Sequence, residues 1–269
     1  MSNEEKNNNP KHYIFGYGSL ICPHSRSITA PSLPKDAAHP VVIKHLQRTW
    51  TARTGAGWTA VGIHVCQDAE CTGVLIEVDS HELAKFDIRE GGYNREMINV
   101  EHVYPILNNS PSLQNQNYQD ILQIAQRRRS SNNPSSDEKD NDTHVNNNND
   151  NGITKEEKEV NIWVYIQNNP KPPTSLHPIP QSYVDIILRG CLSISHDFAM
   201  HFLKHTYGWY SVNNNDTKKK EEGDYIWIND RHVPIYVRAD PMYSKEMGKE
   251  IDELIQSYHL DAFVRRKNV

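Results

Sequence analysis

Cysteine is scarce in this chain, and the few cysteines do not form a recognisable framework. Only Cys22, Cys66, Cys71 and Cys191 occur among 269 residues, and no two are spaced as Cys-x-x-Cys. This excludes a small secreted fold held together by disulfides. A reducing cytoplasmic location is the expectation, with the cysteines acting as small buried apolar residues.

Long apolar runs are missing as well. No segment approaches the ~20 consecutive apolar residues that span a bilayer. The first twelve residues, MSNEEKNNNPKH, also lack the apolar centre of a signal peptide, so residues 1–11 are predicted to be a disordered polar tail. The sequence therefore predicts no membrane partner.

An excess of positive charge is the third absence. Lysine and arginine total 29 against 34 acidic residues, for a net charge of −5. Such a balance provides no electrostatic reason to bind nucleic acid or an anionic membrane. A small-molecule partner is the expectation, and the oligomeric state is left open.

Strand and helix patterns are both present and predict an α+β domain. Runs rich in valine, isoleucine and threonine predict strands at 12–16, 41–54, 59–67, 71–79, 95–106 and 160–166. Asp79 followed by Glu82 forms a capping-box pattern for a helix ending at Gly91 and Gly92. Helical periodicity follows over 181–195, 196–205 and 244–260, whereas 224–238 fits a strand or an irregular clasp.

Two polar segments interrupt these patterns. Residues 108–160 are rich in asparagine, serine and aspartate and are predicted to be a disordered insertion, within which 118–129 could form one short helix. Residues 212–223 form a second polar loop. Because neither side of the insertion has enough strands for a sheet of its own, residues 12–269 are predicted to form a single domain.

The first chemical candidate is the stretch YIFGYGSLI, in which a strand ends in Gly16-Tyr17-Gly18-Ser19. A glycine-flanked turn exposes successive backbone N–H groups that can bind an anion. The alternative is a simple tight turn. Neither a dinucleotide-binding fingerprint nor a Walker loop fits, since no third glycine or Gly-Lys-Ser/Thr follows.

The second candidate is REGGYNR, in which Glu90 stands at the expected end of a helix. The helix dipole disfavours a carboxylate there, so a raised pKa and a role as a base are predicted. The alternative is a solvated ion pair with Arg89. Tyr93 is either the nearest phenol to the site or a packing residue, and Arg89 and Arg95 either meet a substrate carboxylate or pair with surface acids.

Together, FGYGSLI and REGGY resemble the γ-glutamylcyclotransferase superfamily, and most closely its ChaC-type branch. The resemblance covers residues 12 to about 105 and the strand VNIWVYI. It implies a small mixed β-barrel with flanking helices and a helical carboxyl-terminal part. It also implies that Gly16, Tyr17, Gly18, Ser19 and Leu20 bind the head of a γ-glutamyl group and that Glu90 moves protons, with no cofactor and no metal.

The reaction implied by the resemblance is release of 5-oxoproline from glutathione or another γ-glutamyl compound. The carboxyl-terminal half lacks the glycine-rich turn and asparagine of ChaC-type members, which leaves the choice of substrate open. The alternative is a non-catalytic γ-glutamyl-binding or regulatory module with the same pocket. His201 and His205 have the i, i+4 spacing of metal ligands, but Phe202 stands where the zinc-protease pattern needs glutamate, and no metal is predicted.

Overall fold

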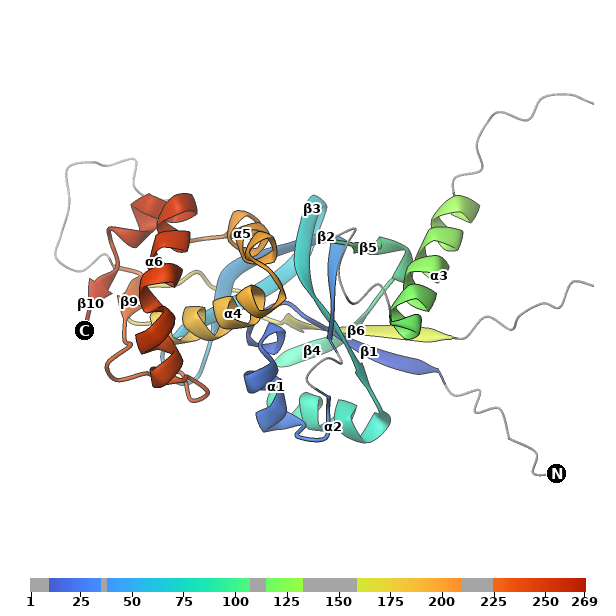
Figure 1. Ribbon diagram of the computed structural model, residues 1–269, viewed down its shortest axis with the longest axis horizontal. Helices are drawn as coiled ribbons and strands as arrows, with labels where there is room; N and C mark the ends of the chain where they lie inside the picture. The colour runs from blue at the N-terminus through green and yellow to red at the C-terminus, as the bar shows by residue number, and fades with distance from the viewer. Residues whose placement is uncertain (1–9, 35–37, 107–114, 133–158, 210–224) are drawn as a thin grey trace, which may run out of the picture.

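The computed structural model describes residues 10–34, 38–106, 115–132, 159–209 and 225–269 (Figure 1). Within them lie one seven-stranded sheet, one three-stranded sheet and six α-helices, which confirms the predicted α+β class. The predicted tail is outside the described residues up to residue 9, and so is the predicted loop at 212–223. None of the helices in the described ranges combines the length and apolar character that crossing a membrane requires.

The large sheet is a curled half-barrel with the order β4-β6-β1-β3-β2-β5, and β8 pairs with the far part of β2. β1 is central, antiparallel to β3 on one side and parallel to β6 on the other. The insertion at 108–160 lies between β5 and β6 in the chain, and both strands belong to this sheet. The strands are β1 (Lys11–Gly16), β2 (Ala38–Arg53), β3 (Thr59–Val78), β4 (Tyr93–Ile98), β5 (Val103–Pro105), β6 (Val160–Gln167) and β8 (Thr206–Tyr207).

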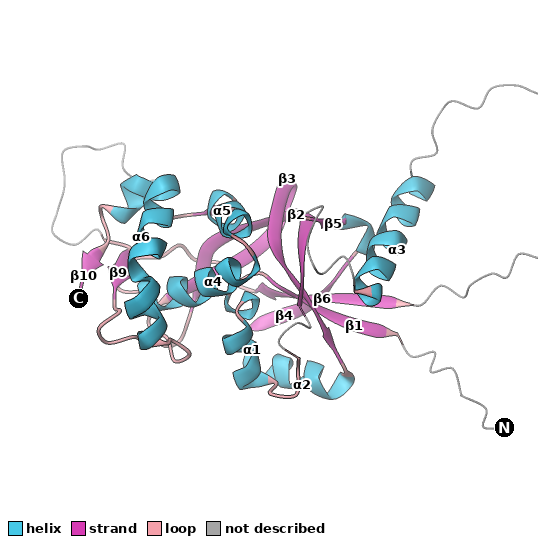
Figure 2. Ribbon diagram, viewed as in Figure 1, coloured by secondary structure: helices cyan, strands magenta, loops and turns pink. Residues whose placement is uncertain are grey.

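β2 and β3 form a long curved hairpin across the molecule (Figure 2). The prediction of two separate strands at 59–67 and 71–79 is wrong, because both lie in the continuous strand β3. The polar interval itself forms a bulge in β3: Lys44 pairs with Glu70 and Leu46 pairs with Val65, so residues 66–69 of β3 lie opposite His45 alone. His45 has a φ of 66°, a left-handed conformation that is uncommon for a residue with a side chain.

Helices cover the sheet from several sides (Figures 1 and 2). The predicted capping box is present at the start of α2, where Asp79 and Glu82 exchange side-chain to backbone hydrogen bonds. The other predicted helices also form, and α4 and α5 bury almost continuous apolar faces. The helices are α1 (Pro23–Thr29), α2 (Ser80–Arg89), α3 (Gln116–Asn132), α4 (Gln181–Ile194), α5 (His196–Lys204) and α6 (Pro241–Phe263).

The predicted insertion at 108–160 contains an ordered, packed helix. α3 spans Gln116–Asn132, longer than the predicted 118–129, and buries Tyr118, Ile121, Ile124 and Ala125. The Tyr118 hydroxyl donates a hydrogen bond of 2.8 Å to the carbonyl of Pro40. Four apolar residues at helical spacing thus suffice to dock this segment on the sheet. The rest of the insertion, 107–114 and 133–158, lies outside the described residues.

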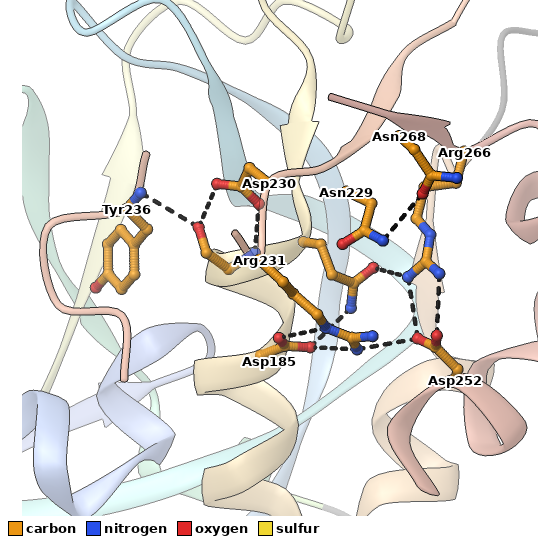
Figure 3. A network of polar contacts seen from close by, with 10 residues as sticks. Asp185, Asn229, Asp230, Arg231, Tyr236, Asp252, Arg266 and Asn268 are labelled. Atoms are coloured by element: carbon orange, nitrogen blue, oxygen red, sulfur yellow. Dashed lines mark hydrogen bonds and ion pairs between the residues drawn. The ribbon is translucent and has the colours of Figure 1, made fainter. Parts of the chain in front are cut away.

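The carboxyl-terminal part is joined to α4 by a network of polar contacts (Figure 3). Asp230 accepts hydrogen bonds from the Ser182 backbone and hydroxyl, at 2.8 and 2.6 Å. Arg231 binds the buried carboxylate of Asp185 with two nitrogens and also reaches Asp252 on α6 at 2.9 Å. The segment 227–234, which the sequence left between strand and clasp, is a short strand, β9 (Trp227–Asn229), followed by this clasp. β9 lies between β7 (Ile179–Pro180) and β10 (Lys267–Asn268).

The Asp252→Asn substitution is expected to destabilise the protein by about 1.5 kcal/mol at pH 7, because Asp252 receives charge-assisted hydrogen bonds from Arg266 and Arg231. Burial alone would raise the pKa of this carboxyl, but the two guanidinium groups outweigh burial and lower it. A depressed folded-state pKa contributes stability above the unfolded value of about 3.9. This contribution is lost as the pH falls through the folded-state pKa.

Thermal unfolding from pH 7 down to pH 3 measures both effects. The matched control is Glu253→Gln, because the neighbouring Glu253 is exposed and pairs only with Lys249 at 3.7 Å within the described residues. The gap in stability between wild type and Asp252→Asn should narrow at acid pH. Equal stability of the two substituted proteins at pH 7 would show that the clasp contributes nothing.

Candidate active site

The turn after β1 is built from residues that allow very close packing. Gly18 leads into a short 3₁₀ helix, η1 (Ser19–Ile21). A Cβ atom on Gly18 would come within 2.8 Å of Val61 and 2.9 Å of the Tyr183 hydroxyl oxygen. A Cβ on Gly16 would come within 2.8 Å of Leu20. Both glycines are therefore required for the turn to sit against β3 and α4.

Two arginine side chains donate hydrogen bonds to the backbone carbonyls of this turn. Arg48 donates to the carbonyl of Tyr17 at 3.2 Å. Arg26 donates to the carbonyls of Leu20 and Ile21, at 2.8 and 2.7 Å. With the carbonyls bound to guanidinium groups, the turn carries a positive electrostatic environment. Such an environment favours a carboxylate ligand at the N–H groups.

Glu90 lies beside this turn although the two are far apart in the sequence. It follows α2 as its carboxyl-terminal cap, where its N–H donates to the carbonyl of Phe86. The glycines after it then lead the chain into β4, beginning at Tyr93. One pocket combines the turn with Glu90, and its lining residues are Phe15, Tyr17, Gly18, Ser19, Leu20, Val61, Glu90, Tyr93, Tyr165 and Tyr183.

Arg89 links the two halves of the pocket. Its side chain is only 7% exposed, with Nε 3.0 Å from Glu90 Oε1. The same guanidinium donates to the Ser19 hydroxyl at 3.1 Å and to the Thr29 hydroxyl at 2.8 Å. The sequence left Arg89 between a substrate carboxylate and a surface acid, and its ion-pair partner in the structure is Glu90 of the pocket itself. Arg89 fixes the distance between the turn and the candidate base.

The pKa of the Glu90 carboxyl is raised above its ordinary value. Burial is the main cause, since the side chain is 19% exposed, and the charges of Arg89 and Arg238 offset part of the rise. The direction agrees with the prediction from the sequence. The cause is burial among aromatic side chains, whereas the sequence argument relied on the helix dipole.

Four tyrosines surround the carboxylate, and none ionises near neutral pH. Burial raises the pKa of Tyr17, Tyr93, Tyr165 and Tyr183 above the ordinary range. The Tyr17 hydroxyl donates to the carbonyl of Tyr165 at 2.7 Å. The backbone N–H of Ser19 hydrogen-bonds the Tyr183 hydroxyl. The phenols are therefore proton donors or apolar walls rather than bases.

The cavity itself is small, about 40 Å³. A few waters fill such a volume, so a larger ligand requires side chains at the mouth to move. Arg238, from the segment after the clasp, has a charge that reaches Glu90, and its buried Nε has no hydrogen-bond partner within the described residues. This Nε–H is therefore a donor that a ligand could use.

The structure brings together most of the residues singled out in the sequence. One pocket is lined by Tyr17, Gly18, Ser19, Leu20, Glu90 and Tyr93. Gly16 does not line it, but its lack of a side chain allows the close packing of Leu20. Arg95 lies apart and pairs with Asp87 at 2.7 Å. Sequence reasoning missed Arg48, Arg238, Tyr165 and Tyr183. Tyr183 carried a signal, because it lies on the apolar stripe of a predicted helix, but that stripe was assigned to packing.

No family model and no curated protein matches the chain. Solved structures similar to it include three that are each at 15% sequence identity. An uncharacterized protein from Homo sapiens has a TM-score of 0.42, with 72% of this chain and 87% of the other covered. A protein named gamma-glutamyl cyclotransferase has a TM-score of 0.44, with 79% and 94% covered. YkqA from Bacillus subtilis has a TM-score of 0.43, with 73% and 54% covered.

Proposed function

We propose that the protein is a γ-glutamylcyclotransferase that releases 5-oxoproline from a γ-glutamyl compound. The observation that carries the proposal is that Glu90 lines the same pocket as Gly18 and Ser19. The two motifs that together resemble the superfamily are thus adjacent in space. The substrate would be a small molecule, and neither nucleic acid nor a membrane has a part in the proposal.

Binding of the substrate would use the turn. The α-carboxylate of the glutamyl head would lie at the N–H groups that begin η1, where the Tyr183 hydroxyl now meets Ser19. The guanidinium groups of Arg26 and Arg48 behind the turn favour that negative charge. Arg238 would meet a carboxylate on the leaving part of the substrate, a feature that glutathione and γ-glutamyl amino acids share.

The chemistry is a ring closure within the substrate. The α-ammonium gives a proton to Glu90, and the neutral amine attacks the γ-carbonyl carbon, which forms the new C–N bond of the lactam. Glu90 gives this proton to the leaving nitrogen as the old C–N bond breaks. It then takes the second proton that the ring nitrogen must lose and passes it on to the departing amine, which leaves as an ammonium ion, so that the lactam keeps one N–H and Glu90 is again ionised. One carboxylate with a raised pKa serves both steps. Because the reaction is intramolecular, holding the glutamyl chain in a folded shape supplies much of the rate.

The second candidate function is a γ-glutamyl-binding module without turnover. The observation that favours it is the ion pair of Glu90 with Arg89 at 3.0 Å, which lowers the basicity of the carboxylate. For catalysis this pair must loosen when the substrate binds. The net direction of the Glu90 pKa, which is raised, favours the enzyme.

The test is a panel of γ-glutamyl compounds, including glutathione, γ-glutamyl amino acids and γ-glutamyl-lysine, with 5-oxoproline measured by chromatography. The enzyme proposal expects product from at least one compound at a rate proportional to protein concentration. Saturable binding by calorimetry without product over hours would instead support the binding module. Absence of both would overturn the assignment of this pocket to γ-glutamyl compounds.

A further inference from the structure

A second group of side chains with ligand chemistry lies away from the proposed active site. It consists of Glu70 on β3 and of His201 and His205, one turn apart at the end of α5. One ligand atom from each residue lies within 4.8 Å of the others. The sequence spacing indicated the two histidines but no third ligand. The fold places Glu70, from a strand far earlier in the chain, beside them.

The distances from the Glu70 carboxylate to the two imidazoles match the edges of a metal coordination tetrahedron. His201 Nε2 is 3.2 Å from Glu70 Oε1, and His205 Nε2 is 3.6 Å from the same oxygen. With bonds of about 2.1 Å to a tetrahedral Zn²⁺, ligand atoms lie about 3.4 Å apart. The imidazole rings are stacked, with centroids 4.1 Å apart and planes at 11°. The rings must therefore tilt toward one another before both in-plane Nε2 lone pairs can point at one ion.

A buried neighbour orients one histidine of the group, and the group borders a cavity. Thr72, which is fully buried, hydrogen-bonds His201 Nδ1 at 2.5 Å and leaves Nε2 free to bind a metal. Such outer contacts orient histidine ligands in known metal sites. Glu70 and His205 also line a second cavity, of about 410 Å³, which shares no lining residue with the proposed active site. A fourth position at the metal would face this cavity.

The surrounding charges limit the affinity without removing the site. The positive charges of Arg48 and Lys204 act on these histidines and oppose a cation. Lys44 and Asp68 line the same cavity and offset one another. Affinity below that of a closed zinc-finger site is therefore expected.

We propose that Glu70, His201 and His205 form a binding site for a first-row divalent cation, best matched to Zn²⁺, with its free coordination position turned toward the cavity between β2 and β3. Two imidazoles and one carboxylate are a ligand set typical of zinc sites that keep an open position. The inference does not depend on the proposed function. His45, held in a left-handed conformation opposite the adjoining bulge, lines the same cavity.

The experiment is titration of the full-length, metal-free protein with Zn²⁺ in competition with a chromophoric chelator at pH 7.5. Co²⁺ serves as the spectroscopic probe of geometry. We expect one equivalent to bind, and Co²⁺ to give the intense visible bands of a four-coordinate site. Weak binding of several equivalents without these bands would mean scattered surface histidines, and would overturn the proposal.

Single substitutions assign the site. His205→Gln and Glu70→Gln are each expected to weaken Zn²⁺ binding by about 100-fold or more, and Thr72→Val by about 10- to 100-fold. The matched control is His196→Gln, which removes an exposed histidine from the same helix. Circular dichroism checks folding of each protein. Equal Zn²⁺ affinity in wild type, Glu70→Gln and His196→Gln would also overturn the proposal. This comparison holds even if His205→Gln or Thr72→Val fails to fold.

Discussion

The Glu90→Gln substitution is expected to lower the rate of 5-oxoproline formation by about 10²- to 10⁴-fold. Glutamine has nearly the shape of glutamate and still accepts a hydrogen bond from Arg89 Nε, which lies 3.0 Å from Glu90 Oε1. It cannot take a proton from the α-ammonium group. The loss should therefore fall on kcat, with substrate binding little changed. Initial rates over a range of substrate concentrations separate the two parameters.

The same substitution is also expected to change the stability of the fold. The direction of that change shows whether activity is lost because the base is missing or because the protein is unfolded. Burial raises the folded-state pKa of Glu90 above that of the unfolded chain. For such a group, the stabilising contribution is fully present below the unfolded pKa, about 4.3, and is lost as the pH rises through the folded-state pKa. At pH 7 the ionised carboxylate is thus a cost that glutamine removes. Glu90→Gln should unfold at the same temperature as wild type or higher.

The control is Glu96→Gln, which neutralises an exposed carboxylate on β4 close in sequence to the site. It should leave kcat and the unfolding temperature unchanged. If Glu90→Gln kept the wild-type rate, Glu90 would not be the base. A pH profile of kcat/KM for the wild type adds an independent check. Its acidic limb should lie above the ordinary glutamate range, because a protonated Glu90 cannot accept a proton.

Local signals in the sequence were sufficient to predict most helices and strands. They also predicted the two segments that form the candidate site, the glycine turn and Glu90. The glycines at 16 and 18, the capping box at Asp79 and the carboxylate at Glu90 are each readable from neighbouring residues. The α+β class and the carboxyl-terminal helices follow from periodicity alone. These features depend on interactions within a few residues, and such interactions leave a pattern in the chain.

The missed features depend on contacts between distant segments. β3 was divided at 68–70 because Asp68 and Glu70 interrupt its apolar alternation, yet the strand continues through a bulge at 66–69, opposite His45 of β2. Glu70 itself became a candidate metal ligand only when α5 packed across β3. Alternation along β2 places Arg48 on the same buried face as Leu46 and Trp50. Its hydrogen-bond partners Thr72, Phe202 and Thr206 come from distant segments and could not be read from the strand.

Arg48 is the basis of the second large expected effect. It is fully buried, and no carboxylate lies within ion-pair distance of it in the described residues. It donates to the carbonyls of Tyr17, Thr72 and Phe202 and to the hydroxyl of Thr206. Its guanidinium also stacks on the Phe202 ring at 3.7 Å. One side chain thus ties the turn of the proposed active site to β3 and α5.

Arg48→Met is expected to destabilise the protein by about 3 to 5 kcal/mol, which corresponds to roughly 10 °C in unfolding temperature. Methionine fills most of the volume, but it removes a charged donor from three buried carbonyls and one hydroxyl. The Phe202 carbonyl keeps a hydrogen bond from the Thr206 hydroxyl, and the Thr72 carbonyl keeps one from the Cys71 thiol. Replacing a buried ion pair with apolar residues can be neutral because both charges leave together, whereas here the acceptors belong to the backbone and stay in place.

The matched control is Arg53→Met, because Arg53 lies at the end of the same strand and makes an exposed hydrogen bond to the carbonyl of Pro172. Its unfolding temperature should stay close to that of wild type. In folded Arg48→Met protein, the freed carbonyl of Tyr17 should raise KM for the γ-glutamyl substrate more than it lowers kcat, since the turn binds and Glu90 reacts. A variant as stable as Arg53→Met, with unchanged KM, would mean that the turn is held by glycine packing alone and that the buried cation behind it has no part in binding.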